Sequence, residues 1–276
     1  MTPPDRWRGL FAVLVTPLGP DGALDEAGAA ALADFYLDRG ASGLVVASVM
    51  GEGSSLTPAE RERLVGAVVE RCGGRAPVLV GSTNPGIDPA RWGVAGVLAA
   101  PRDVRDLAQR TELPLVLLDY PPVTGTVSVD EIAALLDELP RVAAIKLEHV
   151  PSWHKMAALR ARVGDRLRIF GALSGLHVLS ELAAGSDGLM TGAAAPERLV
   201  AVLRAHARGD AAAAQDAYAA ALPLLVFEAQ PGVSIALRKA MLVELGALRC
   251  DHVRPPTVPL DDVMRAEVRR VVARWR

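Results

Sequence analysis

A lysine and a glutamate near the middle of the chain are the residues best suited to chemistry. Lys146 lies in the largely apolar run 141–148, and Glu148 follows it by two positions. Burying an ammonium group is costly, so a lysine in such a run needs a partner or a function. A neutral lysine amine can attack a ketone and form a Schiff base. Alternatively, Lys146 ends a strand and pairs with Glu148 for structural reasons alone. Both interpretations are open at this point.

The alternation of side chains along a β-strand predicts where this pair points. Lys146 and Glu148 should share one face, while Ile145 and Leu147 occupy the other. In a parallel barrel, a polar residue at the carboxyl end of a strand lies in the mouth, where active sites form. If the run is a barrel strand, its lysine is therefore expected at the mouth.

A tyrosine ends another apolar run. Asp119 and Tyr120 close the run 114–119 and precede two prolines. At this rim a tyrosine can donate or relay a proton, whereas a buried tyrosine with a satisfied hydroxyl is the structural alternative. Tyr120 is thus a candidate for proton transfer at the same rim as Lys146.

A glycine-containing loop at 49–55 follows a third apolar run and precedes a helix start. Gly51 and Gly53 would allow close approach to the backbone, and free N–H groups near a helix start favour an anion such as a carboxylate. A tight turn that requires glycine is the alternative. Within this loop, Glu52 either orients groups in the mouth or bonds to the loop amides.

The elements that would position these residues alternate regularly. Asp25, Thr57 and Ser128 are predicted helix caps, the last two within capping boxes. A helix is also predicted from about Ser174, and the segment between the third and fourth strands has room only for a short helix. Apolar strands are predicted at 9–16, 43–48, 77–81, 94–100, 114–119, 141–148, 167–170 and 188–191, and late helices at 196–206, 211–227, 233–245 and 261–275. The pattern predicts an α/β fold, a (β/α)8 TIM barrel over 1–208 with a C-terminal three-helix extension over 209–276.

Composition excludes several classes of function. Thirty basic and thirty-two acidic residues leave a formal charge of -2, without the basic stripe that nucleic-acid binding needs. Although 51% of the 276 residues are hydrophobic, no run approaches the roughly 20 apolar residues of a membrane span. No secretory signal is visible, so we expect a soluble, cytoplasmic protein without nucleic-acid or membrane partners.

The remaining reactive residue types carry little signal. Cys72 and Cys250 lack metal-ligand spacing and are predicted to be free thiols, so no metal site is expected. His149 and His154 are assigned to the surface or to loops. Arg238 and Lys239 fall in a late helix, where packing and surface charge account for them.

Five motifs in order along the chain together identify a family resemblance. They resemble the dihydrodipicolinate synthase and N-acetylneuraminate lyase family over nearly the whole chain. The motifs are Val13-Leu-Val-Thr-Pro17, Met50-Gly-Glu52, Tyr120-Pro121 with Thr124-Gly125, Ile145-Lys146, and Arg254-Pro-Pro256.

This resemblance implies that Lys146 forms a Schiff base with pyruvate or another 2-keto acid. The family's reaction requires no metal or organic cofactor, and its members are usually homotetramers, so a homo-oligomer, tetramer or dimer, is expected here. Loss of hydration inside the barrel would favour the neutral amine that attacks a ketone. By similarity, the substrate-binding set is Val49, Met50, Gly51, Glu52, Gly171 and Met190, with the carboxylate on the loop around Met50 and Gly51.

Several positions depart from the family's pattern. Val49 and Met50 stand where relatives carry two small hydroxyl residues. Leu118 stands where the catalytic tyrosine belongs, while Tyr120 lies two residues on, facing the same side. Val123 replaces the arginine that holds an aldehyde substrate's carboxylate, and the segment after strand three is shortened. These departures speak against lysine biosynthesis and against sialic acid cleavage.

Two hypotheses follow. The first is a Schiff-base lyase, an aldolase or dehydratase, acting on a 2-keto acid and not a true dihydrodipicolinate synthase. In it, Lys146 is the nucleophile and Tyr120 and Glu148 handle protons. The apolar residues around the mouth favour a partner less polar than a sugar. The alternative is a family member that has lost catalysis and acts as a binding or assembly protein.

Overall fold

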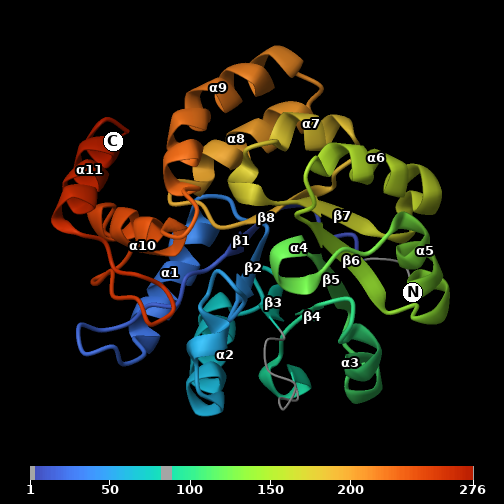
Figure 1. The fold of residues 1–276 in the computed structure, drawn as a ribbon, viewed down its shortest axis with the longest axis horizontal. Helices are drawn as coiled ribbons and strands as arrows, with labels where there is room; N and C mark the ends of the chain where they lie inside the picture. The colour runs from blue at the N-terminus through green and yellow to red at the C-terminus, as the bar shows by residue number, and fades with distance from the viewer. Residues whose placement is uncertain (1–3, 82–88, 276) are drawn as a thin grey trace.

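The computed structural model describes residues 4–81 and 89–275 of the chain. Its strands pair in sequence order, all in parallel, and close into a barrel when β8 pairs with β1 (Figure 1). This confirms the predicted barrel. The strands are β1 (Gly9–Val13), β2 (Gly43–Val46), β3 (Val78–Gly81), β4 (Gly96–Ala99), β5 (Leu115–Asp119), β6 (Val142–Leu147), β7 (Arg168–Gly171) and β8 (Gly188–Thr191).

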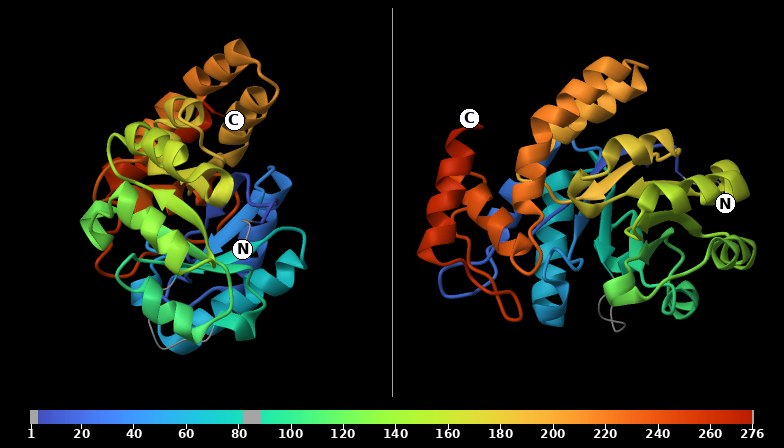
Figure 2. Two further views of the ribbon diagram at one scale, coloured as in Figure 1. Left: turned by 90° about the vertical axis from the view of Figure 1, so that its right-hand side faces the viewer. Right: turned by 45° about the horizontal axis from the view of Figure 1, so that its top comes forward.

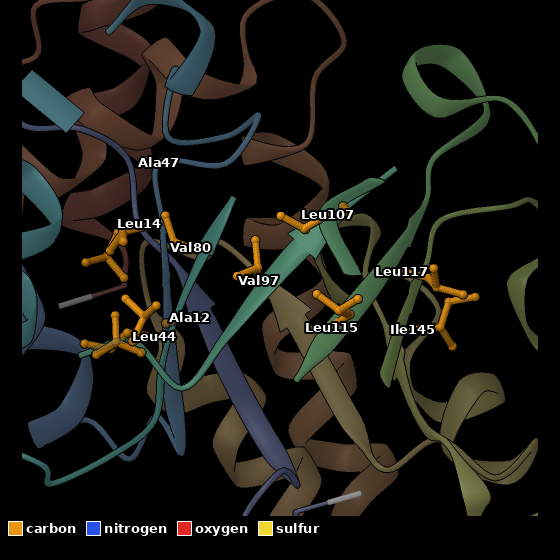
Figure 3. Packing of buried hydrophobic residues seen from close by; sticks show 14 of the residues in the cluster. Ala12, Leu14, Leu44, Ala47, Val80, Val97, Leu107, Leu115, Leu117 and Ile145 are labelled. Atoms are coloured by element: carbon orange, nitrogen blue, oxygen red, sulfur yellow. The ribbon is translucent and has the colours of Figure 1, made fainter. Parts of the chain in front are cut away.

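Side-chain alternation along the strands produces two separate cores. Residues on the outer faces pack beneath the surrounding helices, among them Leu44 of β2, Val97 of β4 and Ile145 of β6, which are labelled in Figure 3. Residues on the inner faces, such as Phe11 and Phe170, fill the barrel interior, where their rings meet edge to face at 5.0 Å between centroids. The filled interior places any cavity at the mouth.

The helices begin where capping residues predicted them. Asp25 accepts a hydrogen bond from the N–H of Gly28, and Thr57 and Ser128 each form a complete capping box. The helices around the barrel are α1 (Glu26–Asp38), α2 (Pro58–Cys72), α3 (Val104–Arg110), α4 (Pro121–Thr124), α5 (Val129–Glu138), α6 (Ser152–Val163), α7 (Val178–Ala183) and α8 (Pro196–Ala207).

Two connections between strands and helices contain short 3-10 helices. A 3-10 helix, η2 (Pro89–Trp92), precedes β4, while the rest of the short connection predicted after β3 lies at 82–88, outside the described residues. The helix predicted from Ser174 was wrong in its start, because Leu173 and Ser174 have positive φ angles of 48° and 60°. These angles interrupt a regular helix, so η4 (Leu173–Gly175) forms first and α7 begins at Val178.

The C-terminal extension comprises α9 (Ala211–Glu228), α10 (Ser234–Glu244) and α11 (Asp262–Ala273). The boundary predicted between residues 208 and 209 falls in the turn between α8 and α9. Figures 1 and 2 show α10 and α11 together at one side of the barrel. Ala194 and Ala195, which follow β8, share a buried cluster with Leu237 and Met241 of α10. The extension therefore packs against the mouth. Among the described residues, no helix is long and apolar enough to span a membrane.

Candidate active site

Lys146 lies at the top of the barrel interior. It shares its face of β6 with Ala144, which lies in the inner core, and alternates with Ile145 and Leu147, which lie in the outer core. Its backbone pairs with Leu118 of β5 and Phe170 of β7. The lysine side chain keeps 13% of its surface exposed. The alternation predicted from sequence is thus present, and it directs the amine toward the mouth.

Glu148 is the ionic partner of this lysine. Its Oε1 lies 2.6 Å from Nζ of Lys146, and its carboxylate side chain is only 12% exposed. The N–H of Glu148 donates to the carbonyl of Asp119 at 2.8 Å, which fixes the glutamate beside the end of β5. At this distance the carboxylate can accept a proton from the ammonium group.

Tyr120 lies at the same rim. Its N–H donates to Oγ1 of Thr124 at 2.8 Å, which holds the residue at the start of α4. Burial, followed by the negative charge of Glu148, raises the pKa of the Tyr120 hydroxyl above its ordinary value. The phenol therefore stays protonated near neutral pH and can only donate its proton or accept a hydrogen bond there.

These three side chains line one cavity of about 300 Å³ at the barrel mouth. Val49, Leu98 and Leu118, from the ends of β2, β4 and β5, make part of its lining apolar, whereas Ser174, Thr191, Ser234 and Arg238 contribute hydroxyl groups and a guanidinium. The cavity is lined by Val13, Ser48, Val49, Met50, Leu98, Leu118, Tyr120, Lys146, Glu148, Leu173, Ser174, Thr191, Gly192, Ala229, Gly232, Ser234, Ile235, Arg238 and Thr257.

The loop after β2 contributes to the cavity only in part. Val49 and Met50 line it, and Ser48, which sequence analysis did not single out, adds a buried hydroxyl with no partner among the described residues. The N–H groups of Met50 and Gly51 donate to no acceptor in the described part of the chain. The loop thus offers N–H donors and one hydroxyl near the cavity.

The other residues expected to bind substrate lie outside the cavity lining. Gly51 is buried, and its carbonyl accepts a hydrogen bond from Thr16. Met190 is fully buried in the interior core. Gly171 packs against the carboxyl of Glu181, and a Cβ at this glycine would lie 1.9 Å from Oε2 of that residue. Gly171 and Met190 thus contribute to the packing around and beneath the mouth.

Glu52 faces the extension and not the cavity. Its carboxylate pairs with Lys239 of α10 and accepts the N–H of Arg254 at 3.1 Å. The Arg254 guanidinium in turn pairs with Glu60 of α2 at 2.5 Å. We call Glu52, Glu60, Lys239 and Arg254 the loop–extension seam. The Gly-Glu and Arg-Pro-Pro motifs therefore meet at this seam, which holds the loop after β2 against α10.

The prediction that packing and surface charge account for Arg238 and Lys239 was wrong about the surface, because both are buried, at 1% and 0% exposure. Lys239 belongs to the seam, whereas Arg238 lines the cavity. A signal existed in the sequence. Adjacent basic residues inside the apolar segment 234–243 cannot both face solvent while their neighbours are buried, and buried charges require partners.

A second buried acid lies behind Lys146 and Glu148. Glu181 of α7 is fully buried, and its Oε1 accepts a hydrogen bond from Ser152 at 2.7 Å. Burial is the main reason that the pKa of Glu181 rises to about 7, and the charge of Glu148 adds to it. Among the described residues, no group of three or more His, Cys, Asp or Glu side chains could hold a metal ion.

The chain is similar to known proteins in both sequence and structure. The model of the dihydrodipicolinate synthetase family matches residues 6–90 and 103–274. An L-2-keto-3-deoxyarabonate dehydratase from Azospirillum brasilense is 28% identical over 98% of this chain and 94% of its own length. The dihydrodipicolinate synthase structure from Rhodopseudomonas palustris is 30% identical, covers 99% of both chains and has a TM-score of 0.90. A prophage protein of this family from E. coli K12, solved in complex with pyruvate, has a TM-score of 0.87 at 23% identity over 97% of this chain and 98% of its own.

Proposed function

Because the chain belongs to the dihydrodipicolinate synthetase family, whose members are lyases of the class I aldolase type, we propose that it is a Schiff-base lyase acting on a 2-keto acid. Lys146 is the nucleophile. The observation that carries the proposal is the position of its amine, which lies in a cavity of about 300 Å³ with a carboxylate at 2.6 Å.

The first step joins the substrate to the protein. Glu148 accepts a proton from the Lys146 ammonium group, and the neutral amine attacks the C2 carbonyl of the keto acid. Water leaves, and the protonated imine that remains withdraws electrons from C3. The raised pKa of Tyr120 keeps its phenol protonated, so it can donate to the departing oxygen.

The second step breaks a bond next to the iminium. In a dehydration, a base removes the C3 proton, and the resulting enamine expels the C4 hydroxyl as water after that hydroxyl gains the proton that the base took from C3. In an aldol cleavage, a base removes the proton of the C4 hydroxyl, and the C3–C4 bond breaks to give an aldehyde and the enamine. Glu148 returns the proton that it took from Lys146 to Tyr120, which has given its own proton to the departing water, and so becomes a carboxylate again. It is the base in either route because this carboxylate adjoins Nζ.

The walls of the cavity suggest what the substrate carries beyond C3. Val49, Leu98 and Leu118 present hydrocarbon over β2, β4 and β5. A chain of hydroxyl groups against this wall would lose hydrogen bonds to water without replacement. We therefore propose a 2-keto acid with a distal part less polar than a sugar.

Borohydride trapping tests the function directly. Reduction in the presence of pyruvate should add one covalent pyruvyl mass to the wild type, located at Lys146 by peptide mass spectrometry. The Lys146→Arg variant keeps the charge but cannot form a stable Schiff base, so it should gain no mass. Lys155→Arg is the matched control, because Lys155 pairs with Asp119 away from the cavity lining and should still allow trapping. Equal labelling of Lys146→Arg and wild type, or no labelling by any 2-keto acid, would refute the proposal and favour a binding protein without catalysis.

A further inference from the structure

The guanidinium of Arg238 is a buried cation whose hydrogen-bonding capacity is largely unused. A guanidinium has five N–H donors. Nη2 donates to the hydroxyl of Ser174, whereas Nη1 meets the thioether sulfur of Met50 at 3.0 Å, and a thioether is a weak acceptor. Nε has no hydrogen-bond acceptor among the described residues. Such a group lining a cavity is under-satisfied until an anion reaches it.

The nearest carboxylate does not complete this coordination. Oε1 of Glu228 lies 3.6 Å from Nε of Arg238, beyond hydrogen-bond distance, and Oε2 is occupied by the N–H of Ala194. Glu228 is fully buried, and burial raises the pKa of its carboxyl. Glu228 therefore offsets the positive charge of Arg238 only weakly, and this charge remains available to an anionic ligand in the cavity.

We propose that Arg238 binds the carboxylate of the 2-keto acid that condenses with Lys146. The inference rests on the proposed function for the identity of the ligand. It assigns to the C-terminal extension the positive charge that fixes the substrate's acid end.

The place of Arg238 in the cavity supports the C1 carboxylate over a distal acid. The side chain reaches Met50 in the substrate loop, and it passes over Gly192, where a Cβ would lie 3.6 Å from its Cδ. The N–H groups of Met50 and Gly51, in the same loop, donate to no acceptor in the described part of the chain. A carboxylate here could accept hydrogen bonds from the planar guanidinium of Arg238 and from backbone N–H groups.

The loss of hydroxyl side chains from the loop makes such a group necessary. Val49 and Met50 supply no side-chain donor, and the apolar wall supplies no charge. Of the described residues that line the cavity, Lys146 and Arg238 are the cationic ones, and the nitrogen of Lys146 becomes part of the iminium, whose positive charge stays beside the carboxylate of Glu148. Arg238 is thus the side chain that can neutralise a carboxylate while the covalent intermediate exists.

Pairs of ligands separate this role from a structural one. Calorimetry with pyruvate and with pyruvamide, its neutral isostere, should be run on the wild type, on Arg238→Lys and on the double variant Arg238→Met/Glu228→Gln. The double variant leaves no charge unpaired at this position, so it avoids the folding cost of a lone buried Glu228. We expect the double variant to bind pyruvate roughly 10- to 100-fold more weakly while pyruvamide binding changes less than about 2-fold, because only the charged ligand loses a charge-assisted pair. Arg238→Lys should fall between the two.

Each other outcome overturns the inference. Equal loss for both ligands would make Arg238 structural, and no loss for either would remove it from the site. Unchanged pyruvate binding with weakened 2-oxoglutarate binding would place the distal acid on Arg238 instead. Borohydride trapping in the same samples separates the two proposals. Arg238-dependent pyruvate binding without an adduct would end the Schiff-base function alone, whereas an adduct with Arg238-independent binding would end this inference alone.

Discussion

Lys146 and Lys239 form two lysine–glutamate pairs with different surroundings, the first partly exposed and the second buried. Lys146 pairs with Glu148 beside a cavity, whereas Lys239 pairs with Glu52 in the loop–extension seam and also donates to the carbonyl of His252 at 2.8 Å. Burial lowers the pKa of Lys239 below its ordinary value, a property often used to mark a reactive lysine. Yet Lys239 is fully buried and does not line the cavity. Access to a space for substrate, and not burial, distinguishes the proposed nucleophile from the structural pair.

Replacing Lys146 by methionine should remove activity, whereas replacing Lys239 by methionine should reduce stability. Lys146→Met should lose the borohydride adduct entirely and activity by roughly 10^4-fold or more, the scale seen when a covalent nucleophile is removed, while stability changes by about 1 kcal/mol or less. Lys239→Met leaves Glu52 buried without its partner and should cost about 3–5 kcal/mol of unfolding free energy. Urea unfolding and adduct mass measure both effects. An adduct on Lys239, or a larger stability loss for Lys146→Met, would break the comparison.

Replacing Glu148 by glutamine should affect proton transfer, whereas replacing Glu52 by glutamine should affect stability. Glu148→Gln removes the proposed base and should slow deuterium exchange at the methyl group of pyruvate by about 10^2- to 10^4-fold, with the fold intact. NMR in D2O follows this exchange without knowledge of the natural substrate. Glu52→Gln should leave exchange within a few fold but lower stability by about 1–3 kcal/mol. Normal exchange in Glu148→Gln would assign the proton transfer to another group.

The sequence predicts the first pair because its geometry is local. Strand alternation alone places Lys146 and Glu148 on one face and Ile145 on the other. The capping boxes at Thr57 and Ser128 are equally local, and the alternation of strands with helices predicts the barrel. These features needed no knowledge of distant contacts.

The second pair could not be predicted because its partners are distant in sequence. Glu52 meets the backbone of Arg254, 202 positions later, and Lys239 lies in a helix whose orientation depends on how the extension packs. For the same reason Arg238 escaped detection as a cavity residue. The family's motifs pointed to Glu52 and Arg254 as important, but a motif does not state whether a residue contacts substrate or supports the loop that does.

The pH dependence of stability tests whether the charge of Glu148 affects the pKa of the buried Glu181. Its pKa is about 7 in the folded protein against 4.5 in a model compound, so the native state retains a proton that the unfolded state has released. Stability should therefore fall as pH rises from about 4.5 to about 7, by up to about 3 kcal/mol, and Glu181→Gln should remove this slope. Since Glu148 contributes to the shift, Glu148→Gln should make the slope shallower. Glu52→Gln should not. Equal effects of the two glutamines would mean that Glu181 does not respond to the cavity's charge.

The smallest effect is expected at the outer end of the seam, where Glu60 pairs with Arg254. The Arg254 guanidinium is the main reason that the pKa of Glu60 falls to about 2 from 4.5. The pair's contribution is therefore complete above about pH 4.5 and is lost as pH falls toward 2. Glu60→Gln keeps the capping box with Thr57 but removes the charge, so it should cost about 1 kcal/mol at pH 7 and nothing near pH 2. Glu60→Ala removes the cap as well, and its cost should persist at both pH values. A Glu60→Gln cost that is independent of pH would show that the hydrogen bonds to Arg254, and not the charge, hold this end of the seam.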